Sequence, residues 1–215
     1  MLGLSSKGIF VWRKVFVFEK FLTTDSDIKP KTNIKVNLRL VLQPENFPSI
    51  VNKLQKFGID AEKRFRSGDK CIVATVNGEI VHWTWVAFKE AYVGVLEKKI
   101  RVPDTNSAYV YGIYTLRKYR RLGIASKAME ALLNHLHSRG IKRVFVLIHH
   151  NNFPSIRYHQ KIGFKKIGTI KFIKILKLKL YSCIGETKED YNFISGMLFI
   201  KDHSKFQFIN GRLLK

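Results

Sequence analysis

The chain has 215 residues, 46% of them hydrophobic, which is enough to bury one sizeable core and excludes a disordered polypeptide. Its 39 Lys and Arg residues outnumber 16 Asp and Glu residues, and the net charge of +23 predicts attraction to anionic partners. Two cysteines, Cys71 and Cys183, exclude a disulfide framework and favour a reducing compartment. No apolar run reaches the length of a membrane span and the N-terminal region lacks a signal-peptide core, so we expect a soluble, unprocessed, cytoplasmic protein.

The first third of the chain predicts strands followed by helices. Residues 8–21 and 34–42 are rich in β-branched and aromatic side chains, which favour strands. Apolar residues then repeat on one helical face over 47–57, and Asp60 stands where it can cap a second short helix. We interpret residues 1–69 as an N-terminal β/α extension or a small subdomain.

The rest of the chain begins with a β-hairpin and continues with alternating strands and helices. Asn77-Gly78, between two β-rich runs, is a strong hairpin signal. The expected elements after it are a strand over 109–115, a helix from Ala125 to Gly140, a strand over 143–149, a helix over 156–162 and an alternating apolar–lysine segment over 164–181. This order predicts an α/β (α+β) fold with a mixed central sheet flanked by helices. Residues 70–182 would form the core, and residues 183–215 a C-terminal strand or tail packed on it.

The segment between the strand over 109–115 and the next helix has the features of an anion-binding turn. It runs Tyr-Arg-Arg-Leu-Gly-Ile-Ala-Ser from residue 119 to residue 126. At such a junction several backbone N–H groups point one way, at the positive end of the helix dipole. Gly123 permits a close backbone approach, and Arg120 and Arg121 add positive charge for phosphates. Taken alone, Arg-x-x-Gly-x-Ala is equally typical of an ordinary structural turn.

A second motif follows one strand later, where residues 152–164 run Asn-Phe-Pro-Ser-Ile-Arg-Tyr-His-Gln-Lys-Ile-Gly-Phe. The two motifs, in this order and spacing, resemble the GNAT acetyltransferase superfamily, with Arg/Gln-x-x-Gly-x-Gly/Ala first and an Asn-initiated helix ending in Gly-Phe second. The resemblance covers about Ala108 to Phe164 and is weaker over residues 70–88.

The resemblance implies a site for acetyl-CoA as co-substrate and no metal. The amides around residues 121–126 would hold the pyrophosphate, the strand end would pair with the pantetheine arm, and Asn152 would hydrogen-bond that arm. The implied cofactor-binding residues are Ile113, Tyr114, Thr115, Arg120, Arg121, Leu122, Gly123, Ile124, Ala125, Ser126 and Asn152. In such proteins the strand over 109–115 splays from the strand over 144–149, and the acyl group lies in the gap.

The residue that would protonate the departing thiolate departs from the family pattern. Many members have a tyrosine four residues before the glycine of Gly-Phe, whereas this chain has His159 there and Tyr158 one position earlier. One residue turns a helical side chain by about 100°. A neutral-pH imidazole can act as a general acid. The alternatives are therefore His159, Tyr158, or no dedicated acid.

The general base is open as well, because the strand over 109–115 carries no carboxylate. The nearest candidates by position are His82, His149 and His150, and ordered water could also remove the proton. Histidine pairs two apart on a helix, as at 135 and 137, or adjacent on a strand, as at 149 and 150, cannot face one ion, so we expect no zinc site.

The motifs together predict an N-acyltransferase that moves an acetyl or other acyl group from CoA to an amine of a small molecule or protein, by direct attack, as a monomer or homodimer. One alternative is a non-catalytic, basic GNAT scaffold that binds nucleic acid or an anionic surface. Another is an acyltransferase with a non-CoA donor, such as aminoacyl-tRNA or an acyl carrier protein.

Lysines without an intervening acid over 164–181 favour an anionic partner. As a single strand, the segment would place Lys165, Lys171, Lys177 and Lys179 on one face and Lys166 and Lys174 on the other. Lysines on an exposed strand also protect against edge-to-edge aggregation, which is the alternative interpretation.

Overall fold

The computed structural model describes residues 10–23, 32, 34–41 and 48–198, and the backbone of 207–209 and 212–214. The chain divides into two compact units, and each unit is built from segments that are not contiguous in the sequence. The first contains residues 1–19, 91–103 and 147–215, and the second contains residues 20–90 and 104–146. Among the described residues, no helix is both long enough and apolar enough to cross a bilayer.

The second unit is built on a mixed sheet. Its strands are β2 (Asn37–Val41), β3 (Lys70–Val76), β4 (Glu79–Ala87), β7 (Ser107–Thr115) and the first part of β8 (Arg143–His149), in the order β2-β3-β4-β7-β8. Neighbours are antiparallel except β7 and β8, which pair in parallel from Ser107 with Arg143 to Tyr109 with Phe145. Asn77 and Gly78, both at positive φ, form the turn of the expected β3–β4 hairpin.

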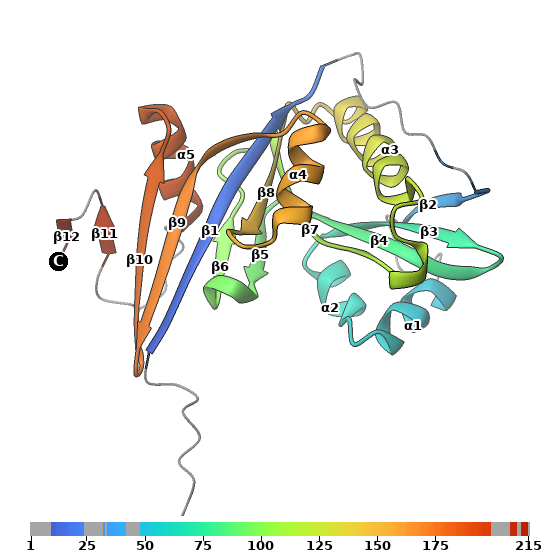
Figure 1. The fold of residues 1–215 in the computed structure, drawn as a ribbon, viewed down its shortest axis with the longest axis horizontal. Coiled ribbons are helices and arrows are strands. Elements are labelled where there is room, and N and C mark those ends of the chain that lie inside the picture. The colour runs from blue at the N-terminus through green and yellow to red at the C-terminus, as the bar shows by residue number, and fades with distance from the viewer. Residues whose placement is uncertain are drawn as a thin grey trace, which may run out of the picture. The chain divides into compact units, whose positions relative to one another are not determined.

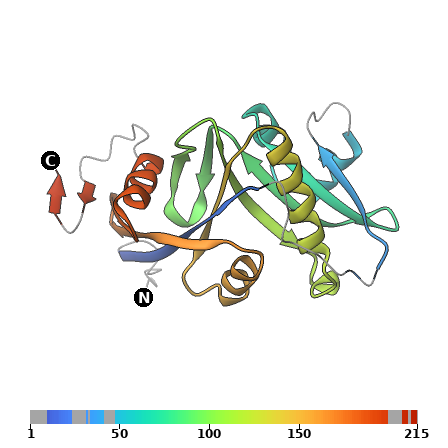
Figure 2. The ribbon, with the colours of Figure 1, turned by 90° about the horizontal axis from the view of Figure 1, so that it is seen from above.

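Helices cover both faces of this sheet (Figures 1 and 2). On one face, α1 (Pro48–Lys56) and α2 (Ala61–Arg66) bury Leu54 and Phe65 against Trp85. On the other, α3 (Ile124–Ser138) buries Ile124 against Val81. Alternate residues of each strand serve the two cores, as the period of a strand requires. The mixed sheet with flanking helices expected from the sequence is confirmed.

The first unit has its own sheet. Its strands and helices are β1 (Phe10–Phe21), β5 (Glu90–Val93), β6 (Lys98–Arg101), α4 (Phe153–Lys161), β9 (Lys165–Ile175), β10 (Leu178–Gly185), α5 (Lys188–Leu198), β11 (Gln207–Ile209) and β12 (Arg212–Leu214). The strand order is β12-β11-β10-β9-β1-β8, and β5 and β6 form a separate hairpin. Helix α5 packs on β9, β10 and β6. The η3 turn (Arg117–Tyr119) and the η2 turn (Gly94–Leu96) are short 3₁₀ helices.

The segment over 164–181 is two strands rather than one, so the expected distribution of its lysines was wrong. Leu176 and Lys177 form a turn between β9 and β10, although no Gly, Asn or Pro marks it. The reversal makes Lys174 and Lys179 direct cross-strand partners on one face. Both reach Glu97, which follows the η2 turn, and Lys177 lies in the turn between the strands.

Candidate active site

Strand β7 carries a bulge where the resemblance implies that the substrate thioester binds. One residue separates Trp83 from Trp85 on β4, whereas two residues separate their partners Tyr114 and Tyr111 on β7. The extra residue is accommodated because Gly112 adopts φ 57°, which favours glycine. A bulge leaves a backbone group outside the regular ladder, and Ile113 follows directly, so this stretch has amides that can face a ligand.

Arg120 folds the chain back over the end of β7. Its Nε donates a hydrogen bond to the backbone oxygen of Thr115 at 3.0 Å, and its guanidinium lies 5.4 Å from the centre of the Tyr114 ring. Tyr114 is exposed on one side and stacks on Trp83 at 4.9 Å on the other. These contacts hold the turn at a fixed distance from the bulge, so Arg120 has a positioning role in addition to its charge.

The turn then enters α3 through two residues in the left-handed region, Arg121 at φ 64° and Gly123 at φ 77°. Gly123 is the N-cap of α3 and provides no side-chain oxygen to cap the helix, which begins with the hydrogen bond from Lys127 N to Gly123 O at 3.0 Å. A helix N-terminus without a side-chain cap favours an anionic acceptor. Ile124 is buried, and Leu122, Ala125 and Ser126 are partly buried.

Glu79, the acidic residue beside this turn, stays ionised, and its negative charge is balanced by neighbouring side chains. The Glu79 carboxylate accepts hydrogen bonds from Lys118 Nζ and Tyr119 Oη, both at 3.0 Å. These two hydrogen bonds lower the pKa of Glu79, so its charge is compensated locally. Arg120 and Arg121 remain accessible beside the helix start, and together these features fit a diphosphate.

His82 is buried on β4 and contacts Thr115, the last residue of β7. Its Nδ1 lies 2.8 Å from Thr115 Oγ1 and its Nε2 lies 2.9 Å from Thr84 Oγ1. Burial lowers the pKa of His82 to about 4, so the ring is neutral at neutral pH. Both ring nitrogens have hydroxyl partners, which leaves neither of them to deprotonate an amine. His82 as the base stays an untested prediction, which these two hydroxyl contacts do not favour.

A polar group that the sequence analysis missed lies against the bulge. Tyr111 Oη donates a hydrogen bond to Asp69 Oδ2 at 2.5 Å. The Arg64 guanidinium lies 5.1 Å from the Tyr111 ring centre, and its Nη1 would be 3.0 Å from a Cβ placed on Gly112. Burial raises the pKa of Asp69 above its ordinary range. The only signal available in the sequence was a polar residue at the start of a strand that is distant from β7 in the chain.

The second motif lies in the first unit, at the start and on the inner face of α4. Asn152 caps the helix by accepting a hydrogen bond from Ser155 N at 3.3 Å, which leaves its side-chain NH₂ to donate. His159 is buried, and its Nδ1 donates to the Ser155 carbonyl at 2.8 Å. The ring packs edge-on against Phe164 and Tyr158, and Nε2 has no partner among the described residues. Burial lowers the pKa of His159 to about 4.

The other histidine candidates for the base lie at the end of β8. The side chain of His149 contacts Asn151, and His150 Nδ1 lies 3.2 Å from the carbonyl of Lys14 and so donates to it. His150 also meets the edge of the Trp12 ring. Within the described ranges, no three His, Cys, Asp or Glu side chains form a group that could hold a metal ion.

Comparison with known proteins agrees with this geometry. The model of the acetyltransferase (GNAT) family matches residues 42–164, which is more than half of the chain. The chain belongs to the GNAT acetyltransferase family. The matched region also includes α1 and α2, which lie outside the stretch over which the two motifs resemble the family.

Individual relatives are distant. An N-alpha-acetyltransferase of Saccharolobus solfataricus is 26% identical over 141 residues, covering 64% of this chain and 75% of the relative. The N-alpha-acetyltransferase of Sulfurisphaera tokodaii is 27% identical over 139 residues, with the same coverage. A phosphinothricin N-acetyltransferase of Streptomyces viridochromogenes is 32% identical over 59 residues, 27% of this chain and 32% of the relative.

Solved structures share the GNAT fold. A GNAT-family acetyltransferase from Novosphingobium aromaticivorans superposes with a TM-score of 0.53 at 13% identity, covering 82% of this chain and 66% of that one. A conserved protein of unknown function from Staphylococcus epidermidis gives a TM-score of 0.54 at 12% identity, covering 78% and 63%. This chain thus spans slightly less than two thirds of each of these structures.

Proposed function

We propose that the protein transfers an acetyl group from acetyl-CoA to a primary amine. The bulge at Gly112 carries this proposal, because it leads through the Arg120-anchored turn to the glycine-capped start of α3. One stretch of chain thereby offers strand amides for an extended arm and helix amides for a diphosphate. Acetyl-CoA has these two parts, and it would supply the acetyl group as an activated thioester.

In this proposal, backbone amides make most of the contacts that bind the cofactor and stabilise the transition state. The left-handed residues Arg121 and Gly123 orient amides toward the diphosphate, and the two arginines balance its charge. The amide of Ile113 or Tyr114, beside the bulge, would donate to the carbonyl oxygen as negative charge develops there. Holding the amine and the carbonyl in contact accounts for much of the rate enhancement.

Tyr111 and Asp69 offer a route for the proton of the amine. Tyr111 Oη would accept the proton from the attacking nitrogen while its own proton passes to Asp69 Oδ2, to which it is already hydrogen-bonded. A raised pKa suits Asp69 to this role, because a carboxylate that is harder to ionise accepts a proton more readily. This pair takes the place of the carboxylate that β7 itself lacks.

Tyr158 suits the role of acid better than His159. With Nδ1–H given to the Ser155 carbonyl, the neutral His159 ring has a lone pair at Nε2 and no proton to donate there. The phenol of a tyrosine, by contrast, is protonated at neutral pH. We expect Tyr158→Phe to lower kcat by about tenfold to 100-fold with little change in CoA affinity. A larger effect of His159→Gln, in a variant that remains folded, would return the role to His159.

The acceptor we favour is the α-amino group of a peptide or protein. Two of the relatives are N-alpha-acetyltransferases. An α-amine has a pKa of about 7.7–8.0 against about 10.4 for lysine, so it is partly neutral at physiological pH. It therefore needs only a weak proton acceptor, such as the shielded Tyr111–Asp69 pair.

Calorimetry with CoA on the nucleic-acid-free protein tests the cofactor site. We expect binding in the micromolar range for the wild type and its loss in Gly123→Leu. Gly140→Leu is the matched control, because Gly140 follows the other end of α3 at φ 81° and a Cβ there meets no atom within 4 Å. No heat with the folded wild type would reject the proposal and favour a non-CoA donor or a binding module.

An acetyl-transfer assay then tests the acceptor. Peptides with free N-termini should react faster than the same peptides with a blocked N-terminus and a free lysine. Asp69→Asn should lower the rate about tenfold or more near neutral pH and less in alkaline buffer, where the amine is already neutral. CoA binding without transfer to any amine would leave the non-catalytic scaffold as the better interpretation.

A further inference from the structure

Near the β9–β10 turn, one face of the β1–β9–β10 sheet is covered by no helix among the described residues. Helix α5 packs on the opposite face, where a Cβ on Gly168 would lie 2.5 Å from Ile194. Cross-strand pairing orders the open face into rows that start at the turn. The first row is Phe10, Ile175 and Leu178, the second is Trp12, Ile173 and Leu180, and the third is Lys14, Lys171 and Ser182. We call these rows, with Leu176 and Lys177 of the turn, the hairpin face.

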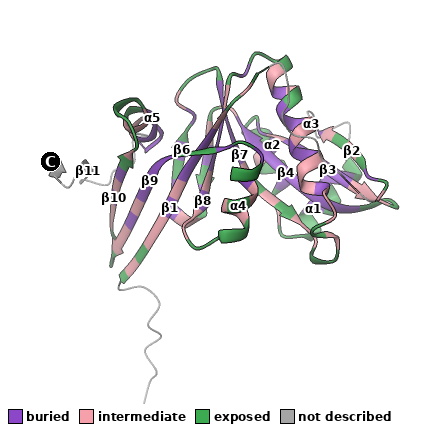
Figure 3. Cartoon of the chain, turned by 45° about the horizontal axis from the view of Figure 1, so that its top comes forward, coloured by how far each residue is buried: buried purple, intermediate pink, exposed green. Residues whose placement is uncertain are grey.

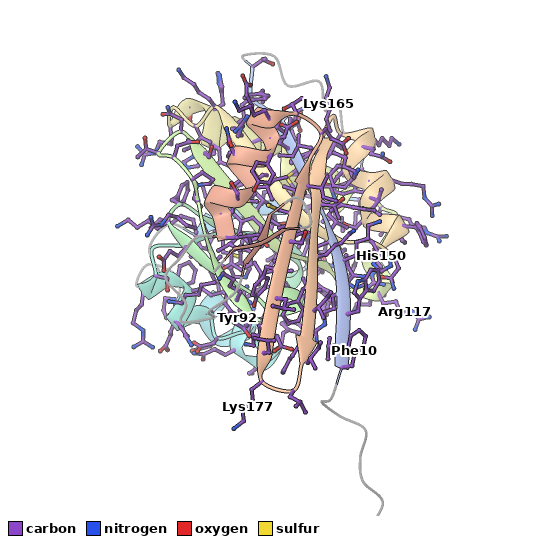
Figure 4. The ribbon with its side chains drawn as sticks, turned by 90° about the vertical axis from the view of Figure 1, so that its left-hand side faces the viewer. Phe10, Tyr92, Arg117, His150, Lys165 and Lys177 are labelled. Atoms are coloured by element: carbon purple, nitrogen blue, oxygen red, sulfur yellow. The ribbon has the colours of Figure 1, made fainter. Side chains whose placement is uncertain are left out.

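The two rows nearest the turn, with the turn itself, carry apolar side chains that are open to solvent. The exposed fractions are 63% for Phe10 and Leu176, 46% for Trp12, 43% for Ile175 and 41% for Leu178. Figure 3 shows exposed residues at the hairpin end of β1, and Figure 4 places Phe10 and Lys177 at that end and Lys165 at the other. A contiguous exposed apolar patch of this kind marks an interaction surface.

The turn presents its leucine at a conformational cost. Leu176 adopts φ 55°, a region in which glycine or asparagine is the usual choice. The side chain that projects from this position is 63% exposed and therefore contributes little to packing. A residue that neither suits the backbone nor fills the core has a better explanation in what it meets outside the molecule.

The third row carries positive charge that no acidic side chain of the described residues balances. Lys14 and Lys171 are direct cross-strand partners, an arrangement of like charges that destabilises a sheet. Among the described residues, neither they nor Lys177 forms an ion pair. Lys174 and Lys179 differ, because both face the other side and pair with Glu97 at 3.0 and 3.6 Å.

The charge of the face selects its partner. A second copy packed symmetrically on this face would bury the unpaired lysines of both copies in one interface, which the cost of desolvating unpaired charges and the doubled positive charge oppose. We propose that the hairpin face docks on an anionic lipid bilayer, with the apolar rows in the interfacial region and the lysine row at the headgroup phosphates. Phe10 and Lys14 are four residues apart on β1, which is about 13 Å along a strand. Interfacial segments penetrate roughly 5–10 Å into a bilayer, so when Phe10 lies at that depth, Lys14 lies at the level of the headgroups. The combination of apolar anchors with lysines is what reversible binding to such a surface requires.

Trp12 reports on this face directly. It is 46% exposed, whereas Trp83 and Trp85, the other two tryptophans, are 5% and 0% exposed. Adding phosphatidylcholine vesicles that contain phosphatidylserine should shift the emission to shorter wavelength and protect it from acrylamide. Pure phosphatidylcholine vesicles, or high salt, should reduce the effect strongly. The measurement uses no CoA, so its outcome is independent of the proposed enzymatic function.

Leu176→Gly separates the docking role from folding. Glycine relieves the positive φ, so the variant should unfold at the same temperature as the wild type or a higher one, yet bind the anionic vesicles about tenfold more weakly. Lys14→Gln with Lys171→Gln should weaken binding about tenfold or more and flatten its salt dependence. Lys56→Gln with Lys63→Gln is the matched control, because it removes the same charge from exposed sites in the other unit and should leave vesicle binding nearly unchanged.

Three results would overturn the proposal. The first is no emission shift with either vesicle at low salt, and the second is an equal shift with neutral vesicles. The third is a Trp12 emission that is already shielded from acrylamide in the free protein, which would mean that another part of the chain or a second copy covers the face. Sedimentation of the wild type and of Leu176→Gly then distinguishes these two occupants.

Discussion

Gly112 lies in the bulge of β7 and packs directly against the side chains of Arg64 and Trp85. Its φ of 57° permits the extra residue of β7, and the space where a Cβ would stand is bounded by Arg64 Nη1 at 3.0 Å and Trp85 Cδ1 at 3.2 Å. Arg64 lies over the rings of Trp85 and Tyr111 at 5.0 and 5.1 Å. A side chain at this position would therefore displace Arg64, which packs on the ring of Tyr111, the hydrogen-bond partner of Asp69.

We expect Gly112→Ala to lower kcat/KM by about tenfold or more, because the bulge and the Tyr111–Asp69 pair both move. The strained φ should also cost about 1–2 kcal/mol of unfolding free energy. Gly58→Ala is the control, since Gly58 has a φ of 74° but no atom within 4 Å of a Cβ. Steady-state kinetics and urea unfolding of both variants check this, and equal activities for the two would contradict it.

Residues near one another in the sequence were easier to predict than those joined only by the fold. The turn before α3 could be predicted because Arg120 to Ser126 are consecutive and a glycine marks the helix start. That it binds an anion stays a prediction. Asp69 could not, because only the pairing of β3, β4 and β7 brings it to Tyr111. The burial of His82 and His159 depends on packing, which a sequence pattern does not contain.

At the scale of elements, the β9–β10 hairpin shows what periodicity cannot predict. Apolar residues and lysines alternate through the turn, so periodicity alone indicated one long strand. The division of the chain at residues 69 and 182 stays a prediction. The elements that were marked by turn or cap residues, such as the Asn77-Gly78 hairpin and the helix capped by Asp60, were predicted correctly.

The η2 turn is fastened to the sheet through Glu97. Its carboxylate accepts a hydrogen bond from Lys174 Nζ at 3.0 Å and also pairs with Lys179 and Arg13, and these contacts lower its pKa. Tyr181 Oη adds a hydrogen bond to Leu96 O at 3.0 Å. Removing this one charge would leave three cations close together, so we expect Glu97→Gln to cost about 1–2 kcal/mol of unfolding free energy.

Glu186→Gln is the matched control, because Glu186 pairs with the single cation Lys166 at an exposed site. It should change the unfolding free energy by less than about 1 kcal/mol. Chemical denaturation at low and high salt measures both effects. Equal losses for the two variants would show that the Glu97 cluster does not act as a unit.

At the scale of the whole molecule, two buried histidines make stability depend on pH. Burial lowers the pKa of His82 and of His159 to about 4, below the ordinary value of 6.5. As the pH falls through this window the unfolded chain takes up protons first, so stability decreases from about pH 6.5 to about pH 4. We expect each histidine to contribute a loss on the order of 2–3 kcal/mol.

Urea unfolding across this pH window measures the effect. His82→Gln keeps hydrogen-bonding groups for Thr84 and Thr115 but does not titrate, so its stability should decline less steeply than that of the wild type. An unchanged slope would mean that other groups, such as the carboxylates, account for the acid sensitivity.

The interleaving of the two units bears on synthesis at the ribosome. The second unit is complete once residue 146 has emerged, whereas the first unit needs residues 1–19 together with residues 147–215. Phe10 pairs with Ile175, so β1 waits through most of translation for its partner strand. At about 5–20 residues per second this delay lasts roughly ten seconds or more, during which the unpaired aromatic strand is a natural target for a chaperone.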